Sequence, residues 1–420
     1  MTLRRFAILS SVFVCFSTSA PAFARTIVVD NDFADCPQAD FNSIQLAVNV
    51  AEPGDKILVC PGIYVENPPP APAAVLITKS DLRIEAQGAP GDVILQGTSA
   101  QLAGFHLLNT KGVLVQGFTV EGFGTPGLGA PNFLSQGGNI RIEGGSENTS
   151  SENTILKNVT KDSLLGDGIQ VINSSANVVE QNTASDNLGP NSDGVQLAGE
   201  FAFNNVIRHN ETFGNGQIGI NIFGPLGTGN VVFGNRSYDN RRIGMRNVSS
   251  TGTLAGGAHG TVIENNHVFA NGLPLIPNAI TGGIVVGASH DVIVRNNRSE
   301  RNNQSGIRLQ NGAVSNLVEK NEVFQNTQDG IQLQTNVDAN IVQLNLVRQN
   351  VRDGIRVFDT ASAENTIEGN VLLDNAEHDA HDDSVGPGTA GTANFWINNK
   401  CGRDDPPGQN ENRPGLCKNP

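Results

Sequence analysis

The chain repeats one short phrase along most of its length, and this repeat restricts the possible folds more than any other feature. A β-branched residue stands three places before an asparagine in nine copies, spaced 24 to 31 residues apart: Ile155/Asn158, Val179/Asn182, Ile207/Asn210, Val232/Asn235, Ile263/Asn266, Val294/Asn297, Val318/Asn321, Val342/Asn345 and Ile367/Asn370. From the second copy on, another asparagine follows five places later. Periods of roughly 20 to 50 residues are typical of solenoids, in which each repeat is one structural unit.

Most copies continue with Gly-Ile-x-Val or a close variant, as in residues 168–171 and 354–357. Short runs with alternating apolar residues predict strands with one buried face, and Asn and Gly favour the left-handed backbone of tight turns. One repeat therefore predicts one coil of three short strands, and stacked coils would align the asparagines into hydrogen-bonded ladders. The leucine pattern of leucine-rich repeats and the four-stranded blades of propellers are not found. We predict an all-β, single-stranded parallel β-helix of about twelve or thirteen coils.

The first residues are typical of a secretory signal. Arg4 and Arg5 precede an apolar run, and Ala22-Phe23-Ala24 has the small-x-small pattern of a cleavage site. Residues 1–24 are therefore predicted to be removed near Ala24, which places the product outside the cell or in a periplasm. No later segment has the roughly 18 to 20 apolar residues of a membrane span.

The rest of the chain divides into three predicted parts. Residues 25–66 are expected to form an N-terminal cap and the first coil, because apolar residues at helical spacing predict one short capping helix: Ile44, Ala47, Val48 and Ala51. Residues 67–375 form the repeats. Residues 376–420 are expected to form an irregular C-terminal cap.

Export would expose the remaining cysteines, Cys36, Cys60, Cys401 and Cys417, to oxidising conditions. Four cysteines allow three pairings, of which the nearest-neighbour pairing would staple each end of the rod. The formal net charge of -14 argues against a nucleic-acid partner, because binding to phosphates needs a basic face. We expect a monomer.

Two segments near the start, Pro53-Gly-Asp-Lys-Ile-Leu-Val59 and Pro61-Gly-Ile-Tyr64, resemble the opening of right-handed parallel β-helix proteins of the pectate-lyase-like superfamily. The repeats resemble the carbohydrate-processing and NosD-like repeats of that superfamily. The resemblance implies a right-handed β-helix, but it leaves the function open, because the superfamily contains lyases, hydrolases, epimerases and non-catalytic proteins.

Aligning the copies on Gly-Ile places one outward position per coil in register. These positions are Gln170, Gln196, Asn221, Arg246, Arg308, Gln332 and Arg356. In sugar-binding relatives the groove follows such a sheet, and amide and guanidinium groups suit hydroxyls and uronate carboxylates. We predict that Arg246 neutralises charge during catalysis and that the other six bind substrate. The alternative is an ordinary solvated strand face.

Carboxylates stand before the same glycine in four copies: Asp167, Asp193, Asp329 and Asp353. Neighbouring carboxylates can raise one pKa, share a calcium ion or divide acid and base roles, so Asp167 and Asp193 are catalytic candidates and calcium is the candidate cofactor. The column resembles that of polygalacturonases, but their Gly-His-Gly and Arg-Ile-Lys signatures are missing. The alternative is aspartate that only forms the turn before glycine.

Three segments are longer or richer in glycine and proline than the usual coil: 247–259, 272–281 and 122–138. Extra residues in a solenoid become loops on one flank, and such loops often form binding walls. Because Arg241, Arg242, Arg246 and His259 are close to the first two segments, we predict a groove near the middle coils, with His259 as a catalytic candidate. Idle loops are the alternative.

The densest polar cluster is His378-Asp-Ala-His-Asp-Asp383. Its residues 379–382 resemble the Asp-Pro-His-Asp motif of periplasmic mannuronan C5-epimerases, in which the histidine is the base at C5. The resemblance implies catalytic roles for His381 and Asp382. The alternatives are a capping segment or a divalent-metal site made from the following candidates: His378, Asp379, His381 and Asp383.

These observations lead to a hypothesis with two rivals. The leading hypothesis is an exported β-helix protein that binds an acidic polysaccharide and modifies it by elimination or C5 epimerisation, both of which begin with loss of the C5 proton. The first rival is a non-catalytic surface protein that uses the same face for carbohydrate binding or adhesion. The second, a periplasmic copper-maturation factor, is disfavoured because Met245 is the only methionine outside the predicted signal.

Overall fold

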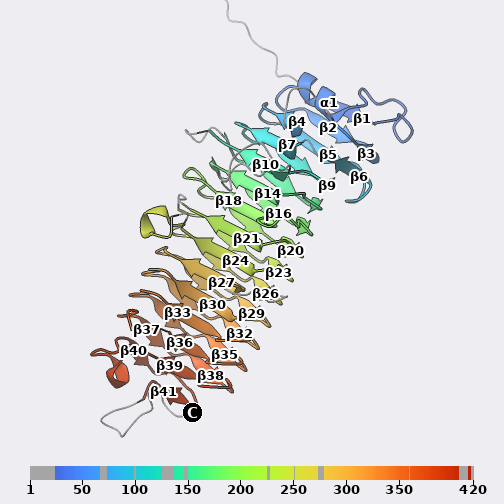
Figure 1. The fold of residues 1–420 in the computed structure, drawn as a ribbon. Coiled ribbons are helices and arrows are strands. Elements are labelled where there is room, and N and C mark those ends of the chain that lie inside the picture. The colour runs from blue at the N-terminus through green and yellow to red at the C-terminus, as the bar shows by residue number, and fades with distance from the viewer. Residues whose placement is uncertain are drawn as a thin grey trace, which may run out of the picture.

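The strands of this chain stack side by side into an elongated rod (Figure 1). The computed structural model describes residues 24–66, 73–98, 101–124, 137–145, 150–224, 228–249, 251–272, 279–358, 360–405 and 415–417. The predicted signal residues up to 23, and parts of the three long segments, lie outside the described residues. Within these ranges the fold is the predicted all-β parallel solenoid with very little helix.

Three parallel sheets form the sides of the rod. Sheet A has 14 strands: β1 (Thr26–Val29), β2 (Lys56–Val59), β5 (Arg83–Ala86), β8 (Leu114–Gln116), β12 (Thr154–Leu156), β16 (Val178–Glu180), β19 (Val206–Arg208), β22 (Val231–Phe233), β25 (Val262–Glu264), β28 (Ile293–Arg295), β31 (Leu317–Glu319), β34 (Ile341–Gln343), β37 (Thr366–Glu368) and β40 (Phe395–Ile397). Sheet B has 12: β3 (Gly62–Tyr64), β6 (Val93–Gln96), β9 (Thr119–Glu121), β13 (Val159–Lys161), β17 (Thr183–Ser185), β20 (Glu211–Phe213), β23 (Arg236–Tyr238), β26 (His267–Phe269), β29 (Arg298–Glu300), β32 (Glu322–Phe324), β35 (Leu346–Arg348) and β38 (Val371–Leu373).

Sheet C carries the candidate site and has 13 strands: β4 (Ala73–Ile77), β7 (Ala103–Leu108), β10 (Gly138–Glu143), β14 (Asp167–Ile172), β18 (Val195–Ala198), β21 (Ile218–Phe223), β24 (Ile243–Val248), β27 (Gly282–Gly287), β30 (Ser305–Gln310), β33 (Ile331–Gln334), β36 (Ile355–Val357), β39 (Ala380–Asp382) and β41 (Asp404–Asp405). Within the described ranges, the remaining elements are a pair of short strands, one α-helix and two 3-10 helices: β11 (Ser150–Ser151), β15 (Ser174–Ser175), α1 (Ile44–Val50), Leu254–Gly256 and Thr389–Gly391.

Alternation along each strand explains the core. In β14, for example, Ile169 and Val171 point inward while Gln170 between them points outward, and β36 repeats the pattern with Ile355 and Val357. The inward residues of all three sheets form one apolar cluster along the rod. Since burial of apolar surface contributes about 25 cal/mol per Å², this core is the main source of stability.

Asparagine side chains form hydrogen-bonded ladders inside the turns. The ladder between sheets A and B contains Asn158, Asn182, Asn210, Asn235, Asn266, Asn297, Asn321, Asn345, Asn370 and Asn399. A second ladder runs from Asn187 to Asn375 and ends on Asp379. Each rung accepts from the preceding coil and donates to the next, so the ladders satisfy buried backbone groups at the turns.

The position of the left-handed residue differs from the expectation. The ladder asparagines themselves do not take positive φ; the residue before them does, as at Lys320 (φ 53°) and Leu344 (φ 55°). At these turns the asparagine is therefore selected for its side-chain amide, not for its backbone. Even leucine is held in the left-handed region, at a cost that the ladder offsets.

Both ends carry a disulfide, and the nearest-neighbour pairing is the one present. Cys36 bonds to Cys60 and Cys401 bonds to Cys417. Helix α1 begins after Ser43, whose hydroxyl accepts from Leu46 N at 3.2 Å, and it packs against β1, β2 and β4. None of the helices in the described ranges is long and apolar enough to cross a membrane.

Candidate functional site

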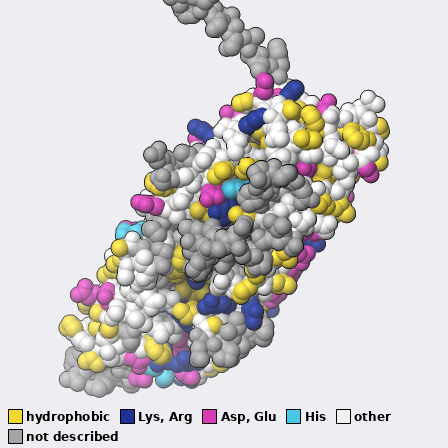
Figure 2. All heavy atoms as spheres, turned by 45° about the horizontal axis from the view of Figure 1, so that its top comes forward, with side chains coloured by type: hydrophobic (Ala, Val, Ile, Leu, Met, Phe, Trp, Pro, Cys, Tyr) yellow, Lys and Arg dark blue, Asp and Glu magenta, His cyan; other side chains and the backbone are white. Residues whose placement is uncertain are grey.

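One outward position of sheet C lines up along almost the whole rod. Strand pairing joins the following residues in order, and we call this set the polar column: His106, Arg141, Gln170, Gln196, Asn221, Arg246, Val285, Arg308, Gln332, Arg356, His381 and Asp405. All seven residues predicted from the Gly-Ile alignment are in it. On the face shown in Figure 2, charged and histidine side chains form separate groups along the rod, with hydrophobic side chains between them.

The alignment on Gly-Ile missed the first members of the polar column. His106 and Arg141 stand between apolar residues in β7 and β10, as Gln170 does in β14, but their coils lack the Gly-Ile pair. Both contact Glu143, with His106 Nε2 at 2.9 Å and Arg141 Nε at 2.8 Å from the same carboxylate oxygen. The signal that identifies them is the apolar-polar-apolar alternation alone.

The carboxylates of Asp167 and Asp193 are buried in adjacent coils beneath the polar column. Asp167 Oδ1 accepts from Asp193 N at 2.7 Å, and its Oδ2 accepts from Gln170 Nε2 at 2.6 Å. Asp193 accepts from Asn221 Nδ2 at 2.6 Å, and Asn221 Oδ1 accepts from Arg246 Nε at 3.0 Å. The two aspartates thus orient the amides of the polar column, and neither is itself at the surface.

Burial raises the pKa of both carboxyls. The pKa of Asp193 rises from 3.8 to about 6, although the charge of Arg246 and the hydrogen bond from Asn221 limit the rise. Burial and the charge of Asp193 raise the pKa of Asp167 well above 3.8. At neutral pH, ionisation of these buried carboxyls costs free energy, so the pair destabilises the folded state.

This pair predicts a specific pH dependence of stability. Because the folded-state pKa of Asp193 is raised, its stabilising contribution is complete below about pH 4 and is lost as the pH rises through about 6, a loss of up to about 3 kcal/mol. We expect Asp193→Asn to remove this loss, as measured by chemical denaturation at pH 4, 6 and 8. The exposed Asp186→Asn is the control. Parallel curves for wild type and Asp193→Asn would contradict the prediction.

Arginines in the middle of sheet C lack acidic partners. Among the described residues, no carboxylate oxygen lies within 4.0 Å of a guanidinium nitrogen of Arg242, Arg246 or Arg308. Burial lowers the pKa of Arg308 to about 10, and burial together with the neighbouring Arg242 lowers the pKa of Arg246. The middle of this face is therefore locally positive. Two pockets lie there, one around Arg242 and Arg246 and one around Arg308 and Gln332.

His259, the catalytic histidine predicted for the middle coils, does not join the polar column. His259 Nε2 contacts the backbone oxygen of Leu254 at 2.8 Å, and its Nδ1 accepts from His290 N at 3.1 Å. Its ring stacks on His290 with 3.7 Å between centroids. Burial and the neighbouring His290 lower the pKa of His259. Both ring nitrogens are used to hold the segment after β24.

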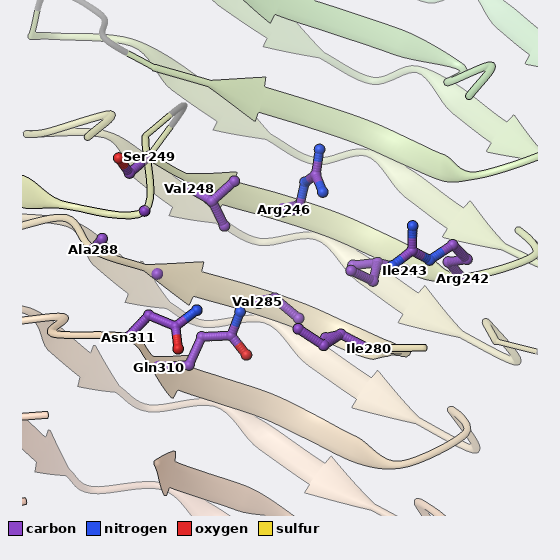
Figure 3. A pocket seen from close by; sticks show the side chains of 12 residues that line it. Arg242, Ile243, Arg246, Val248, Ser249, Ile280, Val285, Ala288, Gln310 and Asn311 are labelled. Atoms are coloured by element: carbon purple, nitrogen blue, oxygen red, sulfur yellow. The ribbon is translucent and has the colours of Figure 1, made fainter. Parts of the chain in front are cut away.

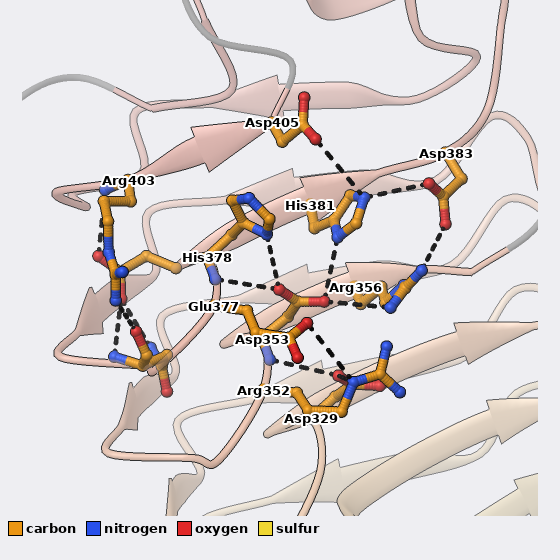
Figure 4. A network of polar contacts seen from close by, with 12 residues as sticks. Asp329, Arg352, Asp353, Arg356, Glu377, His378, His381, Asp383, Arg403 and Asp405 are labelled. Carbon is orange, nitrogen blue, oxygen red and sulfur yellow. Dashed lines mark hydrogen bonds and ion pairs between the residues drawn. The ribbon is translucent and has the colours of Figure 1, made fainter.

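At the C-terminal end of the polar column, a buried carboxylate connects two histidines and an arginine (Figure 4). Asp353 Oδ1 lies 3.0 Å from His378 Nδ1, and its Oδ2 lies 3.0 Å from His381 Nδ1 and 3.4 Å from Arg356 Nη1. His381 Nε2 lies 3.0 Å from Asp383 Oδ1. His381 is thus held between two carboxylates, one buried and one half-exposed.

The groups of this cluster shift one another's pKa values toward the ionised forms. Burial raises the pKa of Asp353, but the hydrogen bonds from His381 and His378 and the charge of Arg356 outweigh it, so the net pKa falls below 3.8. The hydrogen bond to Asp353 and the charges of Asp353 and Asp383 raise the pKa of His381 above 6.5. With a carboxylate oxygen 3.0 Å from each ring nitrogen, His381 donates both hydrogen bonds only in its protonated form.

Two neighbours in the same sequence motif have other contacts. Asp382 points inward, where its Oδ2 accepts from Trp396 Nε1 at 2.8 Å and its Oδ1 accepts from Ser384 Oγ at 2.6 Å. Asp379 Oδ1 accepts from Asn375 Nδ2 at 2.8 Å and so ends an asparagine ladder. The partners of His381 are therefore Asp353 and Asp383, on its own side of the strand.

Neither carboxylate cluster suits calcium. Asp353, His378 and His381 place three ligand atoms within 4.8 Å of one another, but two of them are imidazole nitrogens and Arg356 is adjacent. Calcium takes roughly six to eight oxygen ligands. Asp167 and Asp193 are buried and use their oxygens as hydrogen-bond acceptors. Calcium therefore fits neither cluster, whereas the carboxylate of Asp353 with the imidazoles of His378 and His381 is a donor set that suits a first-row transition metal.

Comparisons with known proteins agree with the fold. The family model described as "Right handed beta helix region" matches residues 93–244, 138–276, 204–317 and 246–400. No curated protein sequence matches significantly. Among solved structures, the A-module of the mannuronan C-5 epimerase AlgE6 from Azotobacter vinelandii is 13% identical, with a TM-score of 0.50, covering 85% of this chain and 87% of its own. The periplasmic alginate epimerase AlgG is 17% identical (TM-score 0.46, covering 82% and 78%), and the pectate lyase Pel9A is 15% identical (TM-score 0.43, covering 84% and 76%). At these identities the likeness concerns the fold.

Proposed function

Because the chain belongs to the right-handed β-helix family, we propose that it uses the outer face of sheet C, as an exported protein, to bind an acidic polysaccharide. One observation carries the proposal: in a chain with a net charge of -14, the middle of the polar column presents arginines that have no acidic partner among the described residues. An unpaired, partly buried guanidinium is costly unless an anion completes it.

The arrangement of the polar column suits a linear polymer. Neighbouring strands are about 4.8 Å apart, so the column places one outward side chain at regular intervals along the rod axis, and all of them except Val285 are polar. Between Arg141 and Arg246 the amides of Gln170, Gln196 and Asn221 are at most 1% exposed and are bonded to Asp167, Asp193 and Arg246. The amides that a polymer can reach are those of Gln304, Gln328 and Gln334, which are partly exposed around the pocket of Arg308 and can exchange hydrogen bonds with hydroxyls. Amides for hydroxyls and guanidinium groups for carboxylates are the two requirements of a polyuronate chain.

We expect the exported, purified protein to bind polygalacturonate or alginate in isothermal titration calorimetry and not to bind neutral dextran. Arg246→Gln with Arg308→Gln should weaken binding by at least about tenfold, since each charge-assisted hydrogen bond contributes about 1.5–3 kcal/mol. The matched control is Arg295→Gln on sheet A, where the arginine pairs with Glu264 at 2.8 Å. Equal binding of dextran, or an equal loss in the control, would contradict the proposal.

Modification of the bound polymer is a second candidate function, and His381 favours it. Held between Asp353 and Asp383 at the end of the polar column, His381 can protonate a leaving oxygen of a bound sugar in its protonated form, and in its neutral form it is a base that can take the C5 proton. NMR spectra of polyuronates incubated with the protein would report elimination and C5 epimerisation together. If His381→Gln, Asp193→Asn and Arg246→Gln left any turnover unchanged, this assignment would be wrong; unchanged spectra would favour binding alone.

The ends of the rod have simpler proposed roles. Helix α1 and the disulfide between Cys36 and Cys60 would close the N-terminal end, within residues 25–66. The segment from residue 376, with the second disulfide, would close the other end. Such caps prevent edge-to-edge pairing of exposed strands. Disulfides are consistent with a secreted or periplasmic protein released by cleavage near Ala24.

A further inference from the structure

The polar column is interrupted at one strand, β27, and the interruption produces a hollow. Val285 occupies the position that holds Arg246 in β24 and Arg308 in β30. Two positions further along, Gly287 stands between Val248 and Gln310, and three positions before Val285 stands Gly282. Strand β27 therefore offers one short apolar side chain where its neighbours offer long polar ones. A pocket of about 130 Å³ lies over it.

One wall of this pocket is apolar. Ile243, Val285 and Ile218 form a buried hydrophobic cluster, separate from the core of the rod, and Val248 packs against it. Ile280 also lines the pocket and keeps 36% of its surface exposed. Because this cluster lies on the outer side of sheet C, it does not contribute to the interior core. Ile218, Ile243 and Val285 are at most 2% exposed, so the aliphatic surface open to a small apolar group is that of Val248 and Ile280, which lie over them.

The other wall is cationic and polar (Figure 3). Arg242 and Arg246 both line the pocket, and Arg242 Nε is buried with no hydrogen-bond partner among the described residues. Arg246 uses its Nε on Asn221, and its guanidinium carbon lies 5.7 Å from the centre of the Phe223 ring. Gln310 and Asn311 add amides across the pocket from the two arginines. An anionic group at this wall would satisfy Arg242 Nε and offset the charges of both guanidinium groups.

We infer that this pocket recognises one acidic sugar unit that carries an acyl substituent, such as an O-acetyl group. The carboxylate would lie against Arg242 and Arg246, the acetyl methyl against the partly exposed Val248 and Ile280 above Val285, and the acetyl oxygen within reach of Gln310 or Asn311. A uronate without an acyl group would satisfy the arginines but leave the aliphatic side chains of the pocket exposed to water. The inference rests on the proposed function and specifies the substrate class.

The test compares an O-acetylated polyuronate with the same polymer after mild alkaline deacetylation, so that chain length and carboxylates are equal. We expect wild type to bind the acetylated polymer about tenfold more tightly, since one small apolar group in a fitted pocket contributes roughly tenfold or more. Val285→Gln restores a polar side chain to the column, as in Gln332, and should abolish this preference while binding to the deacetylated polymer persists.

The controls separate failure of this inference from failure of the proposed function. Val231→Gln makes the same exchange at an outward position of sheet A and should keep the preference. Ile280→Ser is a second pocket variant with less risk to folding, because Ile280 is partly exposed, and it should reduce the preference. Equal binding of the two polymers by wild type would overturn the acyl inference and leave the proposed function intact. Absence of binding to either polymer would overturn both.

Discussion

Replacing Asn297 with alanine is expected to lower the free energy of unfolding by about 3–6 kcal/mol, more than any other single change considered for this chain. Asn297 Oδ1 accepts from Asn266 N at 2.9 Å and from Asn266 Nδ2 at 3.0 Å, and its Nδ2 donates to Ile263 O at 2.9 Å. The substitution leaves Asn266 N without an acceptor and removes one of the two acceptors of Asn266 Nδ2, which keeps Val232 O at 2.9 Å. Ile263 O and Asn321 Oδ1 each lose one donor. Each such group costs about 1–3 kcal/mol.

The measurement is guanidinium chloride unfolding followed by circular dichroism, with Gln343→Ala as the control. Gln343 also loses an amide bond, from its Nε2 to Glu319 Oε2 at 3.0 Å, but it lies on the half-buried outer side of sheet A. The control should change stability by less than about 1 kcal/mol. If Asn297→Ala were as mild as Gln343→Ala, the ladder would not be a main source of stability between coils.

Replacing Asp353 with alanine is the second large expected effect. Loss of the buried carboxylate removes the common partner of His378, His381 and Arg356, and deleting one member of a buried ion pair costs about 3–5 kcal/mol. The same change should lower the pKa of His381, because its hydrogen bond to Asp353 is the main cause of the raised value. Protein NMR titration of the histidine ring reports this second effect directly.

The sign of the pH dependence follows from both groups. The lowered pKa of Asp353 gives stability that is present above pH 3.8 and is lost as the pH falls through the lower folded value. The raised pKa of His381 gives stability that is complete below pH 6.5 and is lost as the pH rises through the higher folded value. The difference between wild type and Asp353→Ala should therefore be largest between about pH 4 and 6.5.

Asp383→Ala is the matched control for Asp353→Ala. Asp383 contacts the other nitrogen of His381 and Arg356 Nη2, both at 3.0 Å, but its side chain is 35% exposed. Exposed ion pairs contribute only about 0.2–1 kcal/mol, so this variant should be nearly as stable as wild type. Equal losses in the two variants would show that the burial of Asp353 does not determine its effect.

The fold could be predicted from the sequence because every coil repeats the same pattern of apolar residues and turn asparagines. Alternating apolar residues fix which side of each strand is buried, and a β-branched residue three places before an asparagine fixes the turn and its ladder. Even Arg308 and Gln332, far from the chain ends, fall in the predicted column. What the repeat did not show was the left-handed residue before each ladder asparagine, since that position holds residues as different as Lys320 and Leu344.

The candidate site was harder to predict because its contacts cross coils of unequal length. Asp353 meets His381 only because β36 pairs with β39, and the sequence between them gives no sign of the 3.0 Å contact. The motif containing His381 suggested its neighbour Asp382, but alternation along the strand turns that side chain to the interior. The closeness of His259 to Arg246 in sequence predicts a shared site, but its ring contacts the backbone of Leu254 in its own segment and of His290 on the next coil.

The alternation of sheet C also separates two kinds of evolutionary change. Inward residues such as Ile307 and Leu309 carry the packing, whereas Arg308 between them faces outward and contributes little to the core. A substitution in the polar column therefore leaves the packing of the core in place, and its cost falls on contacts with the next coil, such as that of Arg246 with Asn221. Ligand preference in this scaffold can change at one place along the rod, and the contacts between coils at that place set the limit.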